Sequence, residues 1–300
     1  METLYKILTR PLLFRFPSDT IHELTVKYAG RISKSKAPLK LLQSLYNYEH
    51  PSLKQEIWGL TFKNPIGLAA GFDKNGTLIP VIRHLGFGFT EVGSITANPS
   101  SGNPKPRSFR LPSDLSIINR MGLNNDGAAT IVRRLEKYVN DFPVGVNIAK
   151  THNPEIAGKK ALDDYRESYL LAKETASYIT LNISCPNTSD GKTFEQPALL
   201  EKLLNYLDIG TDATEPPVLV KFSVDVDRAQ LMELLDVCRQ SAISGFVATN
   251  TSTCREGLST SARVLSKIGK GGLSGQAISE KSTEVIRIIS EYTKREKTII

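Results

Sequence analysis

Asparagine side chains cluster in the parts of this sequence that follow its short apolar runs. An amide offers a hydrogen-bond donor and an acceptor in one plane. Several converging amides therefore suit a flat ligand whose edge alternates carbonyl and N–H groups, such as a pyrimidine or the isoalloxazine ring of a flavin. The candidates are Asn119, Asn124, Asn125, Asn147, Asn182, Asn187 and Asn250.

Two lysines, Lys74 and Lys221, stand at the ends of apolar runs among these amides. A lysine at such a place could form a Schiff base, hold a phosphate or carboxylate, or stabilise negative charge on a reduced flavin. A single lysine would more simply be a solvated loop residue. Two of them at equivalent places favour a functional role.

Cys185 lies in segment 182–188, directly after an apolar run. An isolated cysteine is most often a small buried hydrophobic residue, but Pro186 and the flanking amides place this one on an ordered loop. A free thiol has a pKa of about 8.5, so a modest downward shift would make it a usable base near neutral pH. We therefore treat Cys185 as a candidate catalytic residue, Cys238 as structural, and Cys254 as having no role.

The sequence offers no pattern for a metal centre. Metal sites use histidine, cysteine, aspartate or glutamate at ligand spacing, and the four histidines are scattered without an H-x-x-x-H or C-x-x-C frame. Three cysteines, an odd and sparse number, suggest a reducing compartment and no disulfide framework. We therefore expect neither a metal nor a disulfide.

Short apolar runs alternate with longer helical stretches from about residue 55 onward. This alternation is typical of a parallel sheet covered by helices, either an open doubly wound sheet or a (β/α)8 barrel. We expect strands at 66–69, 90–93, 144–148, 179–183, 218–221, 245–249 and 298–300, and helices near 75–86, 126–140, 160–177, 197–208, 227–242 and 279–295.

Polar residues distinguish these two architectures. Nearly every apolar run delivers one hydrogen-bonding side chain at or just past its carboxyl end. In a barrel these ends form one rim and a single site, whereas in an open sheet the strands far from the switch point would contribute nothing. The pattern therefore favours the barrel, and it rests on Lys74, Ser94, Asn147, Asn182, Lys221, Thr249 and Asn250.

Composition and charge exclude several classes of protein. The chain of 300 residues is 40% hydrophobic and 23% charged, unlike a disordered chain, a collagen-like repeat or a disulfide scaffold, and it lacks the roughly 20-residue apolar stretch of a transmembrane helix. Of the net charge of +7, +4 lies in residues 1–60, so the main body has no basic stripe for nucleic acid. The basic N-terminal part suits an anionic surface such as phospholipid, or is simply a solvated face.

Residues 1–35 have the pattern of two short amphipathic helices, and residues 33–38 have the composition of a linker. With Phe14 and Phe16 exposed nearby, such helices could lie in a membrane interface, although most helices of this kind pack on their own domain. We therefore divide the chain into N-terminal amphipathic helices, residues 1–38, and a (β/α) barrel, residues 39–300.

Seven ordered segments of this chain resemble those of the dihydroorotate dehydrogenases, specifically of the class 2 branch, which is membrane-associated and uses a quinone. The resemblance runs from the first helix to the last residue. The segments are 60–76, 91–96, 105–111, 118–125, 182–188, 248–251 and 271–275.

The resemblance implies a (β/α)8 barrel that carries FMN and oxidises (S)-dihydroorotate to orotate in pyrimidine synthesis, with the substrate stacked on the flavin. The residues that it implies for FMN contact are Ala70, Gly71, Phe72, Asp73, Lys74, Ser94, Asn147, Asn182, Lys221, Thr249 and Gly275. Those that it implies for holding dihydroorotate are Lys74, Asn119, Arg120, Met121, Gly122, Leu123, Asn182, Asn187, Asn250 and Thr251.

A quinone path between the N-terminal helices and the barrel is also implied, where His22 and Arg110 match family positions. We therefore expect a monomer attached peripherally to the cytoplasmic side of the cell membrane, without a nucleic-acid partner. In the implied mechanism a base removes a proton from C5 of the ring while hydride leaves C6 for the flavin, which a quinone reoxidises. Lys221 would offset negative charge on the reduced flavin, and Lys74 would fix the substrate.

The chain departs from the class 2 pattern in two places. Class 2 enzymes usually have serine at the base position, where this chain has Cys185, as the soluble class 1 enzymes do. Class 1-like oxidation with a soluble acceptor therefore stays open, although class 1 enzymes lack the N-terminal helices. The chain also ends at Thr298–Ile300, before the family's glycine-rich phosphate loop, eighth strand and closing helix, so we expect a truncated barrel that binds FMN weakly or is unstable.

Two other functions remain open from the residues alone. A Schiff-base aldolase of barrel fold would use Lys221 or Lys74, and borohydride trapping with a carbonyl substrate would reveal it. A truncated, non-catalytic barrel would act as a binding protein or a peripheral membrane protein, and it would bind vesicles without oxidising dihydroorotate.

Overall fold

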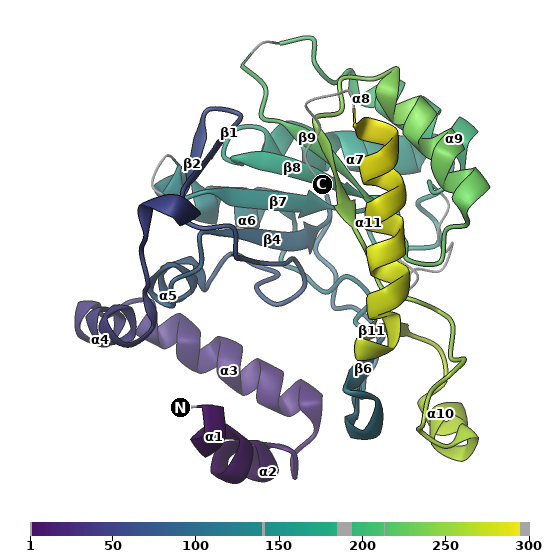
Figure 1. The fold of residues 1–300 in the computed structure, drawn as a ribbon. Coiled ribbons are helices and arrows are strands. Elements are labelled where there is room, and N and C mark those ends of the chain that lie inside the picture. Colours follow the sequence, from purple (N-terminus) through teal and green to yellow (C-terminus); the bar gives the residue numbers. More distant parts are fainter. Residues whose placement is uncertain (1, 140–141, 185–193, 213, 295–300) are drawn as a thin grey trace.

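A six-stranded parallel sheet forms the centre of the computed structural model, which describes residues 2–139, 142–184, 194–212 and 214–294 (Figure 1). Six of the predicted strands are confirmed, and the seventh, 298–300, lies outside the described residues. In sheet order the strands are β3 (Gly67–Leu68), β4 (Phe89–Ile95), β7 (Val144–Ile148), β8 (Tyr178–Asn182), β9 (Val218–Phe222) and β10 (Gly245–Ala248).

The two faces of this sheet differ because successive side chains of a strand point to opposite sides. In β7, Val144, Val146 and Ile148 join the main hydrophobic core, so Gly145 and Asn147 face the inner side of the curled sheet. By the same alternation the inner side carries Tyr178, Thr180 and Asn182 of β8, and Leu219 and Lys221 of β9.

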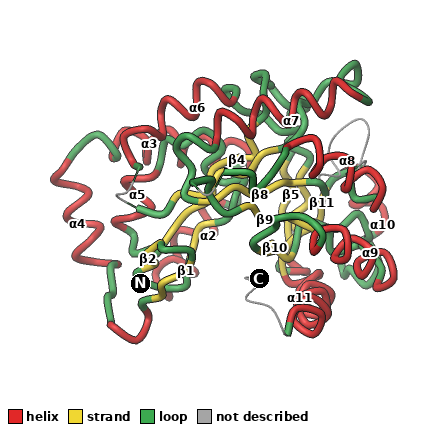
Figure 2. Tube along the Cα trace, turned by 90° about the horizontal axis from the view of Figure 1, so that it is seen from above, coloured by secondary structure: helices red, strands yellow, loops and turns green. Residues whose placement is uncertain are grey.

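Helices cover the outer face of the sheet and surround it in the view of Figure 2. Four of them directly follow a strand of this sheet along the chain, whereas α6 and α11 come after β6 and β11, and all six bury an apolar stripe in the core. They are α5 (Ile79–His84), α6 (Ala128–Leu135), α7 (Lys159–Ala172), α8 (Pro197–Leu207), α9 (Arg228–Arg239) and α11 (Ser279–Thr293). A curled parallel sheet with helices on its outer side is the architecture of an α/β barrel, so the predicted fold class is confirmed.

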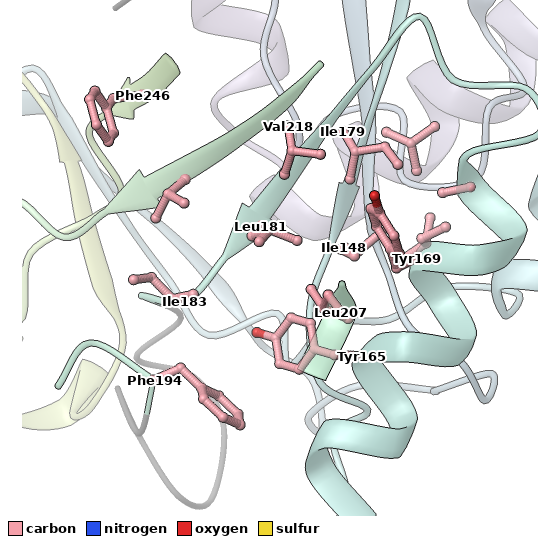
Figure 3. Packing of buried hydrophobic residues seen from close by; sticks show 14 of the residues in the cluster. Ile148, Tyr165, Tyr169, Ile179, Leu181, Ile183, Phe194, Leu207, Val218 and Phe246 are labelled. Carbon is pink, nitrogen blue, oxygen red and sulfur yellow. The ribbon is translucent and has the colours of Figure 1, made fainter. Parts of the chain in front are cut away.

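Aromatic and aliphatic side chains from both layers fill the core between sheet and helices (Figure 3). Tyr165 of α7 lies edge-on to Phe194, with 5.2 Å between ring centroids. Its hydroxyl donates to the Asn182 carbonyl oxygen at 2.9 Å, which ties α7 to the carboxyl end of β8. Cys238 lies in the same core, where burial raises the pKa of its thiol, in keeping with the structural role predicted for it.

Helix α5 begins at Ile79 rather than near residue 75 as predicted. The reason is the turn that precedes it, which Asp73 organises. Its carboxylate accepts the backbone N–H groups of Thr77 at 2.9 Å and Leu78 at 2.7 Å, so the chain is held in a turn until the helix can start.

A second sheet of three antiparallel strands was not predicted. It consists of β5 (Ser108–Leu111), β6 (Ser116–Asn119) and β11 (Gly272–Gly275), with β6 in the middle. Asn119 pairs in register with Gly272 although 153 residues separate them, so no local pattern announces this sheet. Helix α10 (Ala262–Ile268) lies near this sheet, whereas the hairpin of β1 (Gln55–Ile57) and β2 (Leu60–Phe62) lies on the other side of the molecule (Figure 1).

The N-terminal helices form a layer beside the barrel (Figure 1). The layer contains the two predicted helical units, but the linker predicted at 33–38 is wrong in its second half, because a further helix begins at Lys36. Pro38 stands in the first turn of that helix, where no intrahelical bond needs its missing N–H. The elements are α1 (Glu2–Leu4), a π-helical turn (Tyr5–Thr9), α2 (Arg10–Leu13), α3 (Ser18–Ile32) and α4 (Lys36–Tyr46).

Polar contacts fasten the first turns of α3 to the segment that leads into β5. The Asp19 carboxylate accepts the Arg107 backbone N–H at 2.8 Å. Glu23, one turn further, forms an ion pair with Lys105 at 2.5 Å. These contacts hold α3 at a fixed distance from the antiparallel sheet, and the space between them is the mouth of the site described next.

Candidate active site

A pocket of about 1010 Å3 opens where the barrel, the antiparallel sheet and the N-terminal helices meet. Its base is formed by the carboxyl ends of β4, β8, β9 and β10, and by the loop after β3. Strands β5 and β6 form one wall, and helices α2 and α3 form another. The carboxyl ends of parallel strands are where α/β barrels build their sites.

Most residues expected to contact a flavin line this pocket. They come from five strands of one sheet, so the rim converges on a single site, as the barrel interpretation requires. These residues are Ala70, Gly71, Phe72, Lys74, Ser94, Asn182, Lys221 and Thr249.

Most residues expected to hold the substrate line the same pocket. Four of them belong to β6 and the segment after it, and two follow β10, so the candidate substrate side faces the candidate flavin side across one cavity. Besides Lys74 and Asn182 they are Asn119, Met121, Gly122, Leu123, Asn250 and Thr251.

Asp73 and Asn147 lie behind the pocket wall. Asp73 is 1% exposed, caps the turn before α5, and has its pKa raised by burial against four opposing hydrogen bonds. Asn147 is fully buried and accepts the hydroxyl of Ser94. Both residues therefore act on the pocket through the residues that they hold.

Arg120 and Gly275 also lie off the pocket. The Arg120 guanidinium turns to the antiparallel sheet and donates to the carbonyl oxygens of Pro106, at 3.0 Å, and Ile268. Gly275 has φ of +106°, and an added Cβ would lie 2.6 Å from the Leu115 carbonyl oxygen, so the pairing of β11 with β6 requires glycine there. The two remaining candidates, Cys185 and Asn187, lie outside the described residues.

Asparagines at the base of the pocket are bonded to one another. The Asn250 amide donates to Asn182 Oδ1 at 3.1 Å, and the Asn182 amide donates to Ser94 Oγ at 2.8 Å. Ser184, which also accepts from Asn250, donates to the Lys221 carbonyl oxygen at 2.9 Å. Each amide is therefore held in one orientation before any ligand arrives.

Lys221 brings a positive charge to the base of the pocket. It pairs in register with Asn182 across β8 and β9 and is half-buried. Within the described part of the chain its ammonium has neither a hydrogen bond nor an ion pair. An ammonium in this situation suits an anionic or electron-rich ligand.

Lys74 brings the second ammonium to the pocket, and its surroundings disfavour the charged form. Its Nζ donates to the Gly71 carbonyl oxygen at 2.5 Å. Burial, and after it the repulsion of Arg107, lower the pKa of Lys74 to about 8, against the weaker attraction of Asp73 and Asp19. A bound carboxylate would restore the missing stabilisation of the charged form.

His22 and Arg110 lie between the N-terminal helices and the barrel, at the pocket mouth. The His22 ring meets Phe72 edge to face at 5.1 Å, and burial, followed by the charge of Lys74, lowers the pKa of His22. Arg110 donates to the Phe16 carbonyl oxygen at 2.8 Å and covers the Phe14 ring at 4.5 Å. The mouth is therefore a mixed aromatic and cationic passage.

Several lining residues were not predicted from the sequence. Tyr5, Arg10 and Leu13 come from the first helical unit, and their helical spacing was the only available signal. Ser116 and Ile117 come from β6, which no local pattern revealed.

An α/β barrel with a polar pocket at the carboxyl ends of its strands, rich in amides and lysines, defines the class of protein. Among the described residues no group of three or more His, Cys, Asp or Glu is placed to hold a metal ion. Known proteins then narrow this class to one family, because the family model for dihydroorotate dehydrogenase matches residues 52–300.

The sequences of individual relatives align with this chain over nearly its whole length. A dihydroorotate dehydrogenase (quinone) of Christiangramia forsetii is 38% identical over 299 residues, which cover 99% of this chain and 86% of that protein. One of Haloarcula marismortui is 39% identical over 95% of this chain and 79% of that protein. The chain therefore belongs to the dihydroorotate dehydrogenase family.

Solved structures that resemble this chain belong to the same family. The crystal structure of DHODH from Eimeria tenella in complex with ferulenol superposes with a TM-score of 0.80 and 31% identity, covering 93% of this chain and 78% of that one. The ligand-free form from the same organism gives a TM-score of 0.77 and 32% identity over 91% and 80%. The resemblance found in the seven sequence segments, including its quinone-using branch, is confirmed.

Proposed function

We propose that this chain oxidises (S)-dihydroorotate to orotate in pyrimidine biosynthesis, with FMN as the hydride acceptor and a quinone as the final electron acceptor. One observation carries the proposal: a single pocket gathers three of the predicted amides, Asn119, Asn182 and Asn250, with both lysines, and it opens between α3 and the barrel. The relatives named above, dihydroorotate dehydrogenases of the quinone type, supply the substrate and acceptor.

The residues present fit a flavin, the cofactor class on which this family depends. Gly71 has φ of +109°, and an added Cβ would meet no atom within 4 Å, so the loop after β3 leaves open space at the pocket. Ser94 and Asn182 add neutral hydrogen-bonding groups, and Lys221 adds an ammonium that has no hydrogen-bond or ion-pair partner among the described residues. When bound, FMN supplies the two-electron acceptance that the oxidation requires.

This chain's own residues then have distinct tasks. Lys221 places positive charge beside the cofactor, where negative charge develops on reduction. Lys74 holds the substrate carboxylate, and Asn119 and Asn250 hold the ring edge. Cys185 is the proposed base that takes the C5 proton.

The position of the pocket mouth favours a quinone over the soluble acceptor of class 1-like enzymes. A soluble acceptor needs no opening among amphipathic helices. Here the mouth passes His22 and Phe72 on one side and Arg110 and Phe14 on the other. This mixed aromatic and cationic passage suits a quinone head group, which has a flat ring and two carbonyl acceptors.

Visible absorption of the purified chain tests this function. We expect flavin bands that bleach when dihydroorotate is added without oxygen, and that return when a short-chain quinone is added. Recovery with fumarate or NAD instead of quinone would indicate the class 1-like reaction. A colourless protein that borohydride traps on a carbonyl substrate would overturn the proposal in favour of a Schiff-base aldolase.

Exposed apolar side chains on the N-terminal helices support peripheral attachment to a membrane. Large apolar residues of this part are 39–65% exposed, whereas no described helix is both long and apolar enough to cross a bilayer. We therefore propose a monomer on the cytoplasmic face of the cell membrane, with residues 1–38 as its contact and residues 39–300 as the catalytic body. The exposed side chains are Leu4, Tyr5, Ile7, Leu8, Leu12, Phe14 and Phe16.

Replacing Ile7 and Leu8 together by aspartate should weaken vesicle binding about tenfold or more, because both are over 60% exposed and neither lines the pocket. Co-sedimentation with phosphatidylcholine–phosphatidylglycerol vesicles measures it. The matched control is Leu41→Asp in α4, 60% exposed in the parent, which should bind as the parent does. If the parent, the double variant and Leu41→Asp bind vesicles equally well, residues 1–38 are not the membrane contact.

A further inference from the structure

Glu91 is a buried carboxylate that no step of the proposed chemistry uses. It lies on the inner side of β4 and is 6% exposed. It accepts the Asn147 amide at 2.8 Å and the Thr180 hydroxyl at 2.9 Å, and the Tyr178 hydroxyl also hydrogen-bonds to it. Within the described residues no Lys or Arg forms an ion pair with it, so hydrogen-bond donors alone compensate its burial.

Three strands cooperate to build this arrangement. Gly145 of β7 pairs in register with Glu91 of β4 on one side and Tyr178 of β8 on the other. A Cβ at Gly145 would lie 2.2 Å from Tyr178 Cζ, so the missing side chain makes room for the Tyr178 ring to cross β7. Burial and the Glu91 charge raise the pKa of Tyr178 well above its usual value, which keeps its hydroxyl a donor.

A carboxylate can only accept hydrogen bonds, and this fixes the direction of the bonds that lead from Glu91 to Asn182. The Asn250 amide is fixed separately, because it donates to the Ser184 carbonyl oxygen and accepts the Thr251 N–H. Asn147 must turn its NH2 group to Glu91, so its Oδ1 faces Ser94. The Ser94 hydroxyl donates to that oxygen.

The same polarity continues into the pocket. Because the Ser94 hydroxyl donates its hydrogen to Asn147, the Ser94 oxygen is free to accept a hydrogen bond from the Asn182 amide, at 2.8 Å. Asn182 Oδ1 is then left to accept from Asn250 at 3.1 Å. Ser94, Asn182 and Asn250 all line the pocket, whereas Glu91 and Asn147 do not.

We infer that Glu91 is a positioning residue that sets the hydrogen-bond polarity of the pocket base through the relay Asn147–Ser94–Asn182, which meets the backbone-fixed amide of Asn250. The inference rests on the proposed function, in which Ser94, Asn182 and Asn250 contact flavin and substrate. The relay leaves Asn182 with one N–H to offer a ligand. Asn250 Oδ1, which already accepts the Thr251 N–H at 2.8 Å, keeps one lone pair. A flat heterocycle with alternating donors and acceptors needs such a fixed order.

Glutamine at position 91 has nearly the same shape but one acceptor and one donor instead of two acceptors. Either orientation of Asn147 can then be satisfied, because the hydroxyls of Thr180 and Tyr178 can turn. The Glu91 end of the relay then loses its preferred direction, so Ser94 can donate to Asn182 as well as accept from it. Only the Asn250 amide, which donates to the Ser184 carbonyl oxygen at 3.2 Å, still orients Asn182. Aspartate keeps the carboxylate and therefore the polarity.

The test compares Glu91→Gln with Glu91→Asp and Thr180→Val in the full chain. Thr180→Val removes one donor to Glu91 but leaves the relay intact, so it is the matched control. For Glu91→Gln we expect the Kd for FMN and the Kd for orotate each to rise about tenfold, the energy of one lost directed hydrogen bond, with a shifted flavin spectrum. Glu91→Asp should recover part of both affinities, and Thr180→Val should stay within twofold of the parent. Glu91→Gln with parental affinities and spectrum would overturn the inference.

Side-chain amide signals in 15N spectra of the ligand-free chain provide a readout that does not depend on the proposed function. Glu91→Gln should shift or broaden the signals of Asn147 and Asn182. If Glu91→Gln does not fold, Ser94→Ala breaks the relay one step later and should broaden the Asn182 signals in the same way; unchanged signals would overturn the inference. A parent that binds no flavin but shows these amide effects would contradict the proposed function and leave the relay standing.

Discussion

Replacing Cys185 by alanine should lower the turnover of dihydroorotate by at least about a hundredfold and leave bound flavin in place. General bases contribute about 10²–10⁴ in rate, and alanine leaves no group at this position to take the C5 proton. The residues that the family resemblance implies for flavin contact do not include Cys185. Stopped-flow reduction of the flavin by dihydroorotate, together with the visible spectrum, measures both effects.

Two further variants make this test specific. Cys185→Ser introduces the base that class 2 enzymes usually carry, and it should retain activity with a pH profile shifted to higher pH, because a hydroxyl is a weaker acid than a thiol. Cys254→Ala changes a half-buried thiol outside the pocket and should leave turnover unchanged. A Cys185→Ala protein that reduces its flavin at the parental rate would exclude residue 185 as the base.

The barrel could be predicted from the sequence because its determinants are local. The run 144–148 is apolar on its outward positions and ends near a polar side chain, and each neighbouring strand repeats this arrangement. Parallel strands buried on both faces leave such short continuous runs. The rim residues followed, since the carboxyl ends of parallel strands meet at one edge.

The antiparallel sheet could not be predicted in this way. Its strands β6 and β11 pair Ser116 with Gly275 and Asn119 with Gly272, and the latter two residues are 153 positions apart. The flanking residues show no two-residue alternation long enough to indicate a strand. Helix α4 was missed because Pro38 suggested a linker, although proline is tolerated in a first helical turn.

Position in the sequence does not show which groups a side chain contacts. Arg120, which the resemblance implies for holding the substrate, donates to the carbonyl oxygens of Pro106, just before β5, and Ile268, at the end of α10. Glu91 went unnoticed inside an apolar run, because only the register of β4 against β7 and β8 brings it beneath the amides. Side-chain direction depends on partners that are distant in the sequence.

Replacing Lys74 by methionine should weaken orotate binding about a hundredfold, because it removes the ammonium proposed to hold the ligand carboxylate. Titration of orotate against the flavin spectrum measures this. The matched control is Lys63→Met, which removes an exposed lysine paired with Glu49 and should bind orotate as the parent does. Parental affinity in Lys74→Met would show that another group holds the carboxylate.

The pH dependence of stability and of orotate binding shows which effects of Lys74 come from its charge and which come from the size of its side chain. Its folded-state pKa of about 8 lies below the 10.5 of an unperturbed lysine, so the unfolded chain binds more protons between these values, and the Lys74 contribution to stability rises with pH through this range. Orotate binding changes in the opposite direction. The ammonium is the binding form, so affinity is constant below about pH 8 and then falls, by up to tenfold per pH unit.

Lys74→Met should show neither pH dependence. Without ligand it should unfold at a slightly higher temperature than the parent at pH 7, by about 1 kcal/mol in free energy once solvent screening of a half-buried charge is allowed for. Orotate should reverse this order, because only the parent gains the ion pair. A variant that is less stable than the parent both with and without orotate would mean that Lys74 supports the fold through its hydrogen bond to Gly71 and does not hold the ligand. The two roles therefore predict opposite signs in a single unfolding experiment.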